Sequence, residues 1–264
     1  MDDLSFPTLP GYPPEQVRRV QLRLLDMAKV ALPILDRHGF KYFVAFGTLL
    51  GAVRHGGFIP WDDDFDIFLF DEEYDAAIRV LKAELPDDIF VHDRTVDFRY
   101  YPAWARLRDR GSDCSCIKFP DDNVFNHHGI NLDLYRLKKV HADEIDLYRQ
   151  KELVQYLVRK HDAGCFSDEE FNRKFYDATA RLTQLVNISS STNVEREVYS
   201  FVILLRKYEE AELFPLKKMK FEDIEVWCPH RPEVMLQQAY GADYMTCLPY
   251  EKRIPHYDSV RFFP

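Results

Sequence analysis

Residues 47–66 read Gly-Thr-Leu-Leu-Gly-Ala-Val-Arg-His-Gly-Gly-Phe-Ile-Pro-Trp-Asp-Asp-Asp-Phe-Asp. A glycine–threonine pair begins this stretch, and four aspartates crowd its end, at positions 62, 63, 64 and 66. Carboxylates this close repel one another and raise one another's pKa unless a cation joins them. Oxygen ligands at this density suit Mg²⁺ or Mn²⁺ rather than zinc. The stretch therefore predicts a divalent-cation site of the kind that phosphoryl transfer requires.

The residues before the aspartates predict a strand followed by a helix N-terminus. Residues 41–46 are aromatic and β-rich, and residues 49–54 fit a short helix behind a Gly47-Thr48 turn. Unpaired N–H groups and the helix dipole attract anions at such a position. Gly47 and Thr48 are therefore candidate phosphate contacts, although an ordinary turn has the same sequence.

The aspartates themselves begin a second strand, predicted over residues 64–70. Because side chains alternate across a strand, Asp64 and Asp66 share one face and can bind one cation. Asp63 then points elsewhere, and we expect it to be solvated. Asp62 is either a turn residue or an outer ligand that orients the other two.

A further aspartate lies in the middle of an apolar strand, predicted over residues 129–135. Leu132 and Leu134 share one face of this strand, and Asp133 lies on the other. A lone buried aspartate is costly unless it is paired or bound to a metal. Asp133 is therefore a candidate for the same site, and the alternative is an ion pair with Arg106 or Arg136.

The remaining sequence predicts an α+β fold, in which a mixed sheet carries the aspartates and helices pack on it. Helices are expected at 14–37, 72–85, 143–161, 167–186 and 194–208, and a hairpin at 219–227. We divide the chain into a catalytic core at 1–142, a helical subdomain or insertion at 143–212, and a C-terminal hairpin, helix and tail at 213–264. The polar residues 187–193 are the best linker candidate.

Composition narrows the function. The chain has 264 residues and a net charge of −9, whereas a general nucleic-acid binder is normally basic, so no nucleic-acid partner is expected. No secretory signal and no apolar run near the roughly 20 residues of a membrane span are present. The five cysteines form no regular framework, which indicates reduced thiols. These features predict a cytoplasmic protein, with peripheral contact at the inner face of the membrane left open.

A zinc site is the competing metal hypothesis. Cys114 and Cys116 precede His127 and His128, which are residue types that bind zinc. The spacing fits no standard finger, and a thiol pair on one face of a strand is more often part of a core. The sequence favours the core interpretation.

The motif at 47–66 resembles the signature of the LicD family, which belongs to the DNA-polymerase-β-like nucleotidyltransferase superfamily. A second block, Tyr240-Gly241-Ala242-Asp243-Tyr244-Met245 followed by Pro249, Arg253 and His256, is similar to one in bacterial LicD proteins. The resemblance implies a nucleotidyltransferase-like mixed sheet. It also implies that Asp64, Asp66 and Asp133 are the catalytic metal-binding acids, with Asp62 as a further metal ligand.

Further residues are assigned from the resemblance together with their charge. Gly47, Thr48, Arg54, His55, Arg106 and Arg253 are the candidate donor-binding residues. LicD-like enzymes transfer phosphocholine, or a related phospho-alcohol, from a CDP-linked donor to a sugar hydroxyl. The acceptors are glycans such as lipopolysaccharide, teichoic acid or lipid-linked precursors. The resemblance thus implies a Mg²⁺-dependent (or Mn²⁺-dependent) transferase that uses CDP-choline and releases CMP.

Two other functions stay open at this point. True nucleotidyl transfer would use a nucleoside triphosphate and release pyrophosphate in place of CMP. A non-catalytic binding protein is the third hypothesis, and the presence of all three expected acids speaks against it, since like charges without a cation destabilise a fold.

Overall fold

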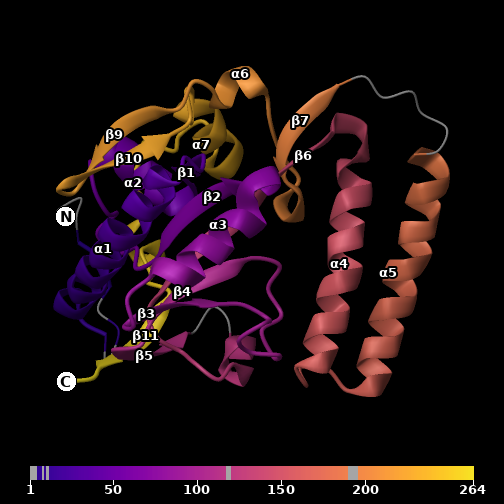
Figure 1. Cartoon of the computed structure of the whole chain (residues 1–264), viewed down its shortest axis with the longest axis horizontal. Coiled ribbons are helices and arrows are strands. Elements are labelled where there is room, and N and C mark those ends of the chain that lie inside the picture. The colour runs from indigo at the N-terminus through magenta and orange to yellow at the C-terminus, as the bar shows by residue number, and fades with distance from the viewer. Residues whose placement is uncertain (1–4, 8, 10–11, 117–119, 190–195) are drawn as a thin grey trace.

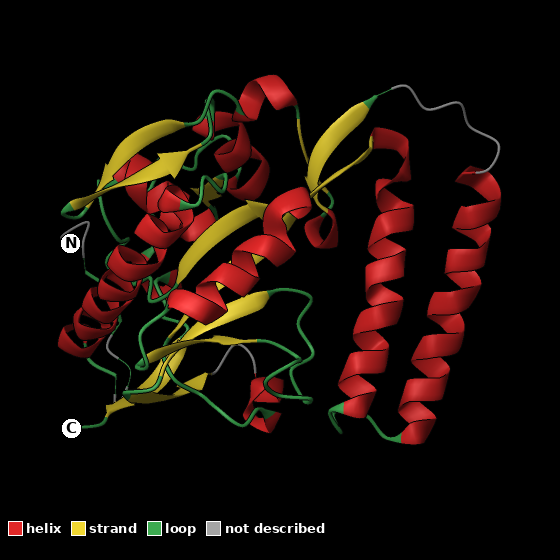
Figure 2. Ribbon diagram, viewed as in Figure 1, coloured by secondary structure: helices red, strands yellow, loops and turns green. Residues whose placement is uncertain are grey.

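A curled mixed sheet forms the centre of the protein, with helices packed on it and two long helices standing at one end (Figures 1 and 2). The computed structural model describes residues 5–7, 9, 12–116, 120–189 and 196–264. The N- and C-terminal parts of the chain lie on the side of the sheet away from the two long helices (Figure 1). The predicted α+β class is confirmed.

The main sheet has the strand order β1-β2-β6-β4-β3. These strands are β1 Tyr42–Val44, β2 Phe65–Phe70, β6 Asn131–His141, β4 Ala105–Asp109 and β3 Ile89–His92. β2 and β6 run parallel, and the other pairs are antiparallel. The far half of β6 pairs with β7 (Glu197–Phe201), which pairs with β8 (Arg206–Tyr208).

Two small sheets complete the strands. β9 (Lys217–Phe221) and β10 (Ile224–Cys228) form the predicted hairpin, which turns at Glu222. β5 (Ser112–Cys116) pairs with β11 (Tyr257–Phe262), so the C-terminal strand lies beside a segment from the middle of the chain. This second pairing brings the residues just before β11 close to the start of β2.

The α-helices are α1 Pro14–Arg37, α2 Phe46–Arg54, α3 Asp71–Glu84, α4 Ile145–Asp162, α5 Asp168–Ser189, α6 Glu210–Leu213 and α7 Pro232–Tyr240. Single 3₁₀ turns occupy Pro120–Val124, Ala142–Glu144, Val202–Leu204 and Tyr250–Lys252. Among the described residues, no helix combines the length and the apolar character that crossing a membrane would need.

Helices α1 and α3 lie side by side against one face of the sheet (Figure 1). The apolar stripe of α1 is buried in the core, since Val17, Val20, Leu24 and Ala28 have no exposed surface. The Tyr74 hydroxyl of α3 accepts a hydrogen bond from the Ala105 N–H at 2.7 Å and donates one to the Leu134 carbonyl at 2.8 Å. These contacts fix α3 over β4 and β6 and leave the opposite face of the sheet for the aspartates.

The helix predicted at 194–208 is wrong. Residues 194 and 195 lie outside the described residues, and the remainder forms β7, a 3₁₀ turn and β8. The free edge at the far half of β6 supplies hydrogen-bond partners from residues 138–141, which a local sequence pattern does not show. Both strands thereby join the main sheet, while the division at 143 and 212 stays a prediction.

Smaller corrections concern the ends of elements. β1 stops at Val44, and α2 already begins at Phe46, so Gly47 and Thr48 lie in the first helical turn rather than before it. Residues 114–119 predict a single strand from sequence. β5 ends at Cys116, and residues 117–119 lie outside the described residues. Helix α5 continues to Ser189, so the predicted linker at 187–193 is partly helical, and its last four residues are not described.

Gly129 provides a test of the packing between β4 and the entrance to β6. A Cβ atom at this position would lie 1.9 Å from the backbone oxygen of Asp109. We expect Gly129→Ala to lower the free energy of unfolding by about 1–3 kcal/mol, because a backbone segment must move to admit the methyl group. Urea unfolding measures the change.

Gly111→Ala is the matched control, since a Cβ there would approach no atom closer than 3.4 Å. Equal midpoints for Gly129→Ala and the wild type would contradict the close approach of the two strands.

Candidate active site

The register of three neighbouring strands places two aspartates and an arginine in one row across the sheet. Asp66 of β2 lies opposite Asp133 of β6, and Asp133 lies opposite Arg106 of β4. Residues directly opposite each other point to the same face of a sheet. The row therefore projects from the face that α1 and α3 leave open.

Three donors hold the Asp133 carboxylate. Trp104 Nε1 donates to Oδ1 at 2.5 Å, and Arg106 Nε donates to the same oxygen at 2.9 Å. Asn131 Nδ2 donates to Oδ2 at 2.8 Å. Because each carboxylate oxygen has two lone pairs, one acceptor position remains, and it is on Oδ2. Asp133 is thus held in one orientation with a single position for a metal or a hydroxyl group.

Arg106 is itself hydrogen-bonded to two carboxylates. Its side chain is buried, and Nη1 donates to Asp122 Oδ2 at 2.6 Å while Nε donates to Asp133. Burial alone would lower the pKa of Arg106, but Asp133 and Asp122 raise it well above its usual value. We predicted from the sequence that Arg106 neutralises donor charge, whereas in the structure its charge is already shared by two acids.

Asp66 gives the strongest indication that this group of residues fits a cation. It is buried, and its Oδ1 has no hydrogen-bond partner among the described residues. Burial raises its pKa well above the usual value, and the charges of Asp64, Asp133 and Asp62 raise it further. An orphaned buried oxygen surrounded by acids fits a divalent cation, which would satisfy the oxygen and offset the repulsion.

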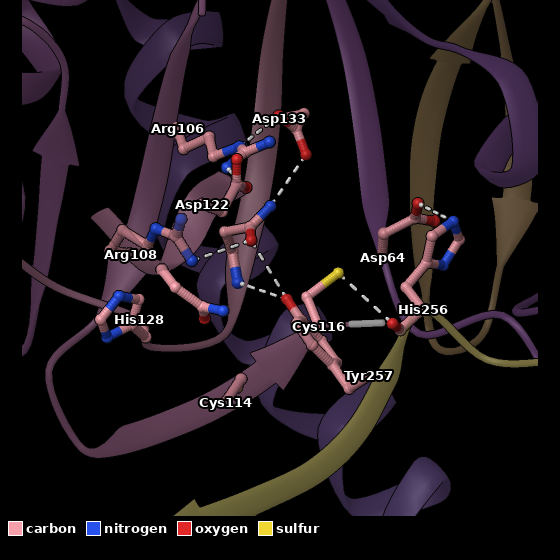
Figure 3. A pocket seen from close by; sticks show the side chains of 12 residues that line it. Asp64, Arg106, Arg108, Cys114, Cys116, Asp122, His128, Asp133, His256 and Tyr257 are labelled. Atoms are coloured by element: carbon pink, nitrogen blue, oxygen red, sulfur yellow. Dashed lines mark hydrogen bonds and ion pairs between the residues drawn. The ribbon is translucent and has the colours of Figure 1, made fainter. Parts of the chain in front are cut away.

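A second acidic group lies beside Asp66. Asp62, Asp64 and His256 place one ligand atom each within 4.8 Å of one another. Figure 3 shows Asp64 and His256 on one side of a small pocket, opposite Arg106, Asp122 and Asp133. Burial alone would lower the pKa of His256, but Asp64, Asp63 and Asp62 raise it to about 9. The imidazolium therefore acts as a counter-charge here, and a divalent cation would compete with it for the same carboxylates.

The prediction that Asp63 is solvated is wrong. Its side chain has no exposed surface, and Oδ1 accepts a hydrogen bond from the His256 N–H at 2.6 Å. The Tyr257 N–H donates to Oδ2 at 3.1 Å. Asp63 thus binds the residues at the start of β11 to the acidic loop, residues 62–64. The two bonded residues, Asp63 and His256, are 193 positions apart, so alternation along a strand does not predict their contact.

The N-terminus of α2 is arranged around Asp62 and Asp66. A Cβ atom on Gly47 would lie 2.2 Å from Asp62 Oδ2, so the carboxylate rests directly against this glycine. The Thr48 hydroxyl is buried and accepts a hydrogen bond from the Asp66 N–H at 2.9 Å. Thr48 therefore positions the backbone of Asp66, and its side chain is outside the cleft lining.

A cleft of about 630 Å³ opens over the acidic group. One wall is aromatic: Phe46, Trp104, Tyr135 and Phe201 lie in it, with ring centres 4.9–6.4 Å apart in five of the pairs. Arg54 lies in the lining, and its Nη1 donates to the Tyr244 carbonyl at 3.0 Å. The cleft therefore presents carboxylates, an aromatic surface and a guanidinium to one volume.

The structure gathers most, but not all, of the candidate residues around this cleft. Its lining includes Gly47, Arg54, Asp62, Asp64, Asp66, Arg106 and Asp133. His55 lies at a separate surface hollow that Glu222 also lines. Arg253 is buried behind the lining, with its guanidinium 4.9 Å from the ring centre of Trp61 and bonded to the Leu248 carbonyl at 2.7 Å. The roles assigned to these residues stay predictions.

Sequence reasoning missed the residues that hold the acids in place. Gln21 of α1 donates through Nε2 to the carbonyl of Asp62 at 2.8 Å and to that of Ile59 at 3.1 Å. Asn131 connects Asp133 to Arg108, whose Nη1 donates to Asn131 Oδ1 at 3.0 Å. Two signals in the sequence could have identified them. Gln21 is a polar residue inside the apolar stripe of α1, and Asn131 is a polar residue two positions before Asp133.

The competing zinc site does not assemble in the part of the chain that the structure describes. Cys114, Cys116 and His128 surround the small pocket of Figure 3, which has a volume of about 40 Å³. Cys116 Sγ donates to the His256 carbonyl at 3.4 Å, and His127 packs edge-on against Phe90. Asp62, Asp64 and His256 are the one set of three possible ligands that lie close enough for a metal among these residues.

Comparison with known proteins agrees with this geometry. Residues 39–135 match the family described as LicD/FKTN/FKRP, nucleotidyltransferase domain, so this part of the chain is similar to that domain. The match covers β1, α2, β2 and the first half of β6, which together carry the row of acids. The mixed α+β fold is consistent with a nucleotidyltransferase-like LicD domain.

Three relatives illustrate the range of the family. The lipopolysaccharide cholinephosphotransferase LicD of Haemophilus influenzae is 39% identical over 64 residues, which are 24% of each chain. The human ribitol 5-phosphate transferase FKRP is 30% identical over 82 residues, 30% of this chain and 17% of the relative. An uncharacterised protein of Rickettsia prowazekii is 29% identical over 172 residues, 56% of this chain and 59% of the relative. The chain thus spans less than two thirds of each relative's length.

Gly47→Ala tests the contact between α2 and Asp62. The added methyl group would displace the Asp62 carboxylate, which is the mobile end of a side chain, so the backbone need not move. We expect the affinity for Mn²⁺, measured by titration calorimetry, to fall about 10- to 100-fold.

The unfolding midpoint serves as the control, because alanine is a better helix former than glycine and stability should not drop. Unchanged Mn²⁺ affinity in the folded variant would show that the position of Asp62 does not matter for the cation.

Proposed function

We propose that the protein is a divalent-cation-dependent transferase that moves phosphocholine from CDP-choline to a sugar hydroxyl of a cell-surface glycan and releases CMP. The observation that carries this proposal is the unpartnered Asp66 oxygen in an acidic group beside an aromatic-walled cleft. The names of two relatives, a cholinephosphotransferase and a ribitol 5-phosphate transferase, support phospho-alcohol transfer as the reaction class.

The acids divide the work of binding the cation. Asp66 offers Oδ1, and Asp62 and Asp64 lie close enough for their charges to raise its pKa. The one acceptor position left on Asp133 Oδ2 is kept for the acceptor hydroxyl. When bound, Mg²⁺ supplies charge neutralisation for the donor diphosphate. The hydrogen bonds to Asp133 and the contact of Asp62 with Gly47 keep these carboxylates in place before CDP-choline binds.

The donor diphosphate also needs a cationic side chain. Arg106 is bonded to two carboxylates, so its charge is largely offset. Arg54 lies in the cleft lining on the last turn of α2, and its Nη1 donates to the backbone carbonyls of Tyr244 and Thr246. We therefore assign the diphosphate contact to Arg54 in preference to Arg106.

The chemical step is a displacement at phosphorus. The acceptor oxygen forms a bond to the phosphorus that bears choline, and the bond from that phosphorus to the oxygen of the CMP phosphate breaks. The hydroxyl proton passes to a carboxylate, for which Asp133 Oδ2 is the candidate base, and the bonding electrons leave with CMP.

The aromatic wall favours choline over an uncharged alcohol. Trp104, Tyr135 and Phe201 pack against one another and face the cleft that holds the carboxylates. A quaternary ammonium is attracted both by the faces of such rings and by nearby negative charge. Ribitol, which is uncharged, would gain neither interaction.

The first test is turnover of CDP-choline with Mg²⁺, with water as the acceptor in place of a sugar hydroxyl, compared with CTP and ATP. We expect metal-dependent CMP release that EDTA abolishes and that Asp66→Asn reduces at least about 100-fold, because the variant loses a carboxylate ligand. Asp87→Asn, the same change at an exposed position, should leave turnover unchanged.

The products separate the alternatives. Pyrophosphate release from a triphosphate, with no CMP from CDP-choline, would replace the proposal with nucleotidyl transfer. Absence of binding to every nucleotide in the presence of Mg²⁺ would favour a non-catalytic protein.

Phe201→Leu tests the choline-binding wall, because it removes a π face and keeps an apolar side chain of similar size. We expect the ratio of the Kd values for CDP and CDP-choline to fall about 5- to 30-fold, with the Kd for CDP itself unchanged. Phe221→Leu, in an aromatic cluster outside the cleft lining, is the matched control. An equal loss of affinity for both ligands would exclude a specific role in binding choline.

A further inference from the structure

Exposed apolar side chains lie in the lining of the cleft and next to lining residues along the chain. Leu204, Leu248 and Ile254 belong to the cleft lining, and Leu205, Met245 and Tyr250 are close to lining residues along the chain. These six residues, which we name the apolar rim, are 37–51% exposed. A group of large apolar side chains left in contact with water at a binding site marks an interaction surface.

The apolar rim is built from two segments that are far apart in sequence. Leu204 and Leu205 lie at the turn between β7 and β8, and the other four follow α7. Both segments reach the cleft because β7 joins the main sheet while the C-terminal segment passes over α2 to the acidic loop. The tertiary fold, rather than one apolar stretch of sequence, therefore assembles the rim.

Leu205 adds an independent observation. Its φ of 54° lies in the left-handed region, where a leucine is unfavourable and a glycine or an asparagine would be at ease. Its side chain is nevertheless exposed, so packing in the core does not explain the choice of leucine. A strained residue that also exposes an apolar side chain is expected where that side chain has a partner.

The position of the rim decides between the kinds of partner. A second copy of the chain, or a protein seated on the rim, would cover the mouth through which substrates must enter the cleft. A lipid surface would deliver an amphiphilic acceptor through the same mouth. The chain carries a net charge of −9, so contact with an anionic surface is unfavourable, and apolar insertion into a neutral interface is the mode that remains.

We propose that the apolar rim docks the protein on a neutral lipid surface, so that the acceptor hydroxyl is presented from an amphiphile at the membrane–water interface. The docking is independent of the reaction catalysed, whereas the assignment of the amphiphile as acceptor rests on the proposed function. Leucine, isoleucine and methionine supply the apolar contact, and Tyr250 suits the interface because its ring is apolar and its hydroxyl is polar.

The test is co-sedimentation of the full chain with phosphatidylcholine vesicles, without nucleotide. We expect the wild type to bind, and the combined variant Leu205→Asn, Met245→Ser, Tyr250→Ser to partition at least about tenfold less. None of these three residues lies in the cleft lining, so CMP release from soluble CDP-choline should be unchanged. Asparagine is used at position 205 because it tolerates the left-handed conformation.

The matched control is the combined variant Val96→Ser, Phe98→Ser, Tyr176→Ser. These three apolar residues are outside the cleft lining and are more exposed than those of the rim. This control should bind vesicles as the wild type does, and an equal loss in both variants would overturn the proposal. A wild type that stays in solution, or one that forms a dimer through the rim in light scattering, would also overturn it. Asp66→Asn should bind vesicles normally, so a failure of docking is distinguishable from a failure of the proposed reaction.

Discussion

The pairing of β2 with β6 sets two buried aspartates directly opposite each other, and their like charges repel. Many of the surrounding side chains offset this repulsion. Asp66 and Asp133 occupy facing positions on parallel strands, and Asp62 and Asp64 lie at the entrance to β2. Burying several like charges in one place is costly unless opposite charges and hydrogen-bond donors accompany them. Arg106, His256 and the Trp104 and Asn131 donors provide this compensation in part. Asp66 Oδ1 is left without a partner among the described residues, which is where a cation fits.

The support for Asp133 continues well beyond its immediate neighbours. Asn131 is held by Arg108 and by the Tyr257 hydroxyl, and Arg108 Nε donates to His92 Nδ1 at 3.4 Å. Burial and the charge of Arg108 lower the pKa of His92 to about 4, so the imidazole is neutral at physiological pH. A neutral ring that accepts at Nδ1 carries its proton on Nε2, which faces Asp97 Oδ2 at 3.4 Å. These contacts let Arg108 remain buried although it forms no ion pair with a carboxylate of the described residues.

The C-terminal segment completes the site from the opposite direction. Asp63 binds the backbone at His256 and Tyr257, and Tyr257 reaches Asn131 on β6. Arg253 stacks on Trp61 and bonds to the carbonyl of Leu248, which lies in the lining at the mouth of the cleft. Residues near 60 and near 255 therefore form one unit. The same C-terminal segment supplies most of the apolar rim, so the geometry of the acids and the surface around the cleft are linked through a few hydrogen bonds.

The sequence by itself determined many of the local elements and the acidic residues of the candidate cation site. The apolar stripe of α1, the alternation of Asp64 and Asp66, and the isolated Asp133 were each readable, because helices, strands and charge density leave local patterns. Only the tertiary structure decided which residues compensate the acids and which position them. Strand register sets Arg106 opposite Asp133 as a counter-charge. Asp63, through its contact with β11, and Thr48 and Gln21, through bonds to backbone groups, hold the acidic segment in place. Strand β7 was mistaken for part of a helix for the same reason, since its partner on β6 lies about 60 residues away, and β8 pairs in turn with β7. Pairing across such separations is decided by packing and register, which no local pattern encodes.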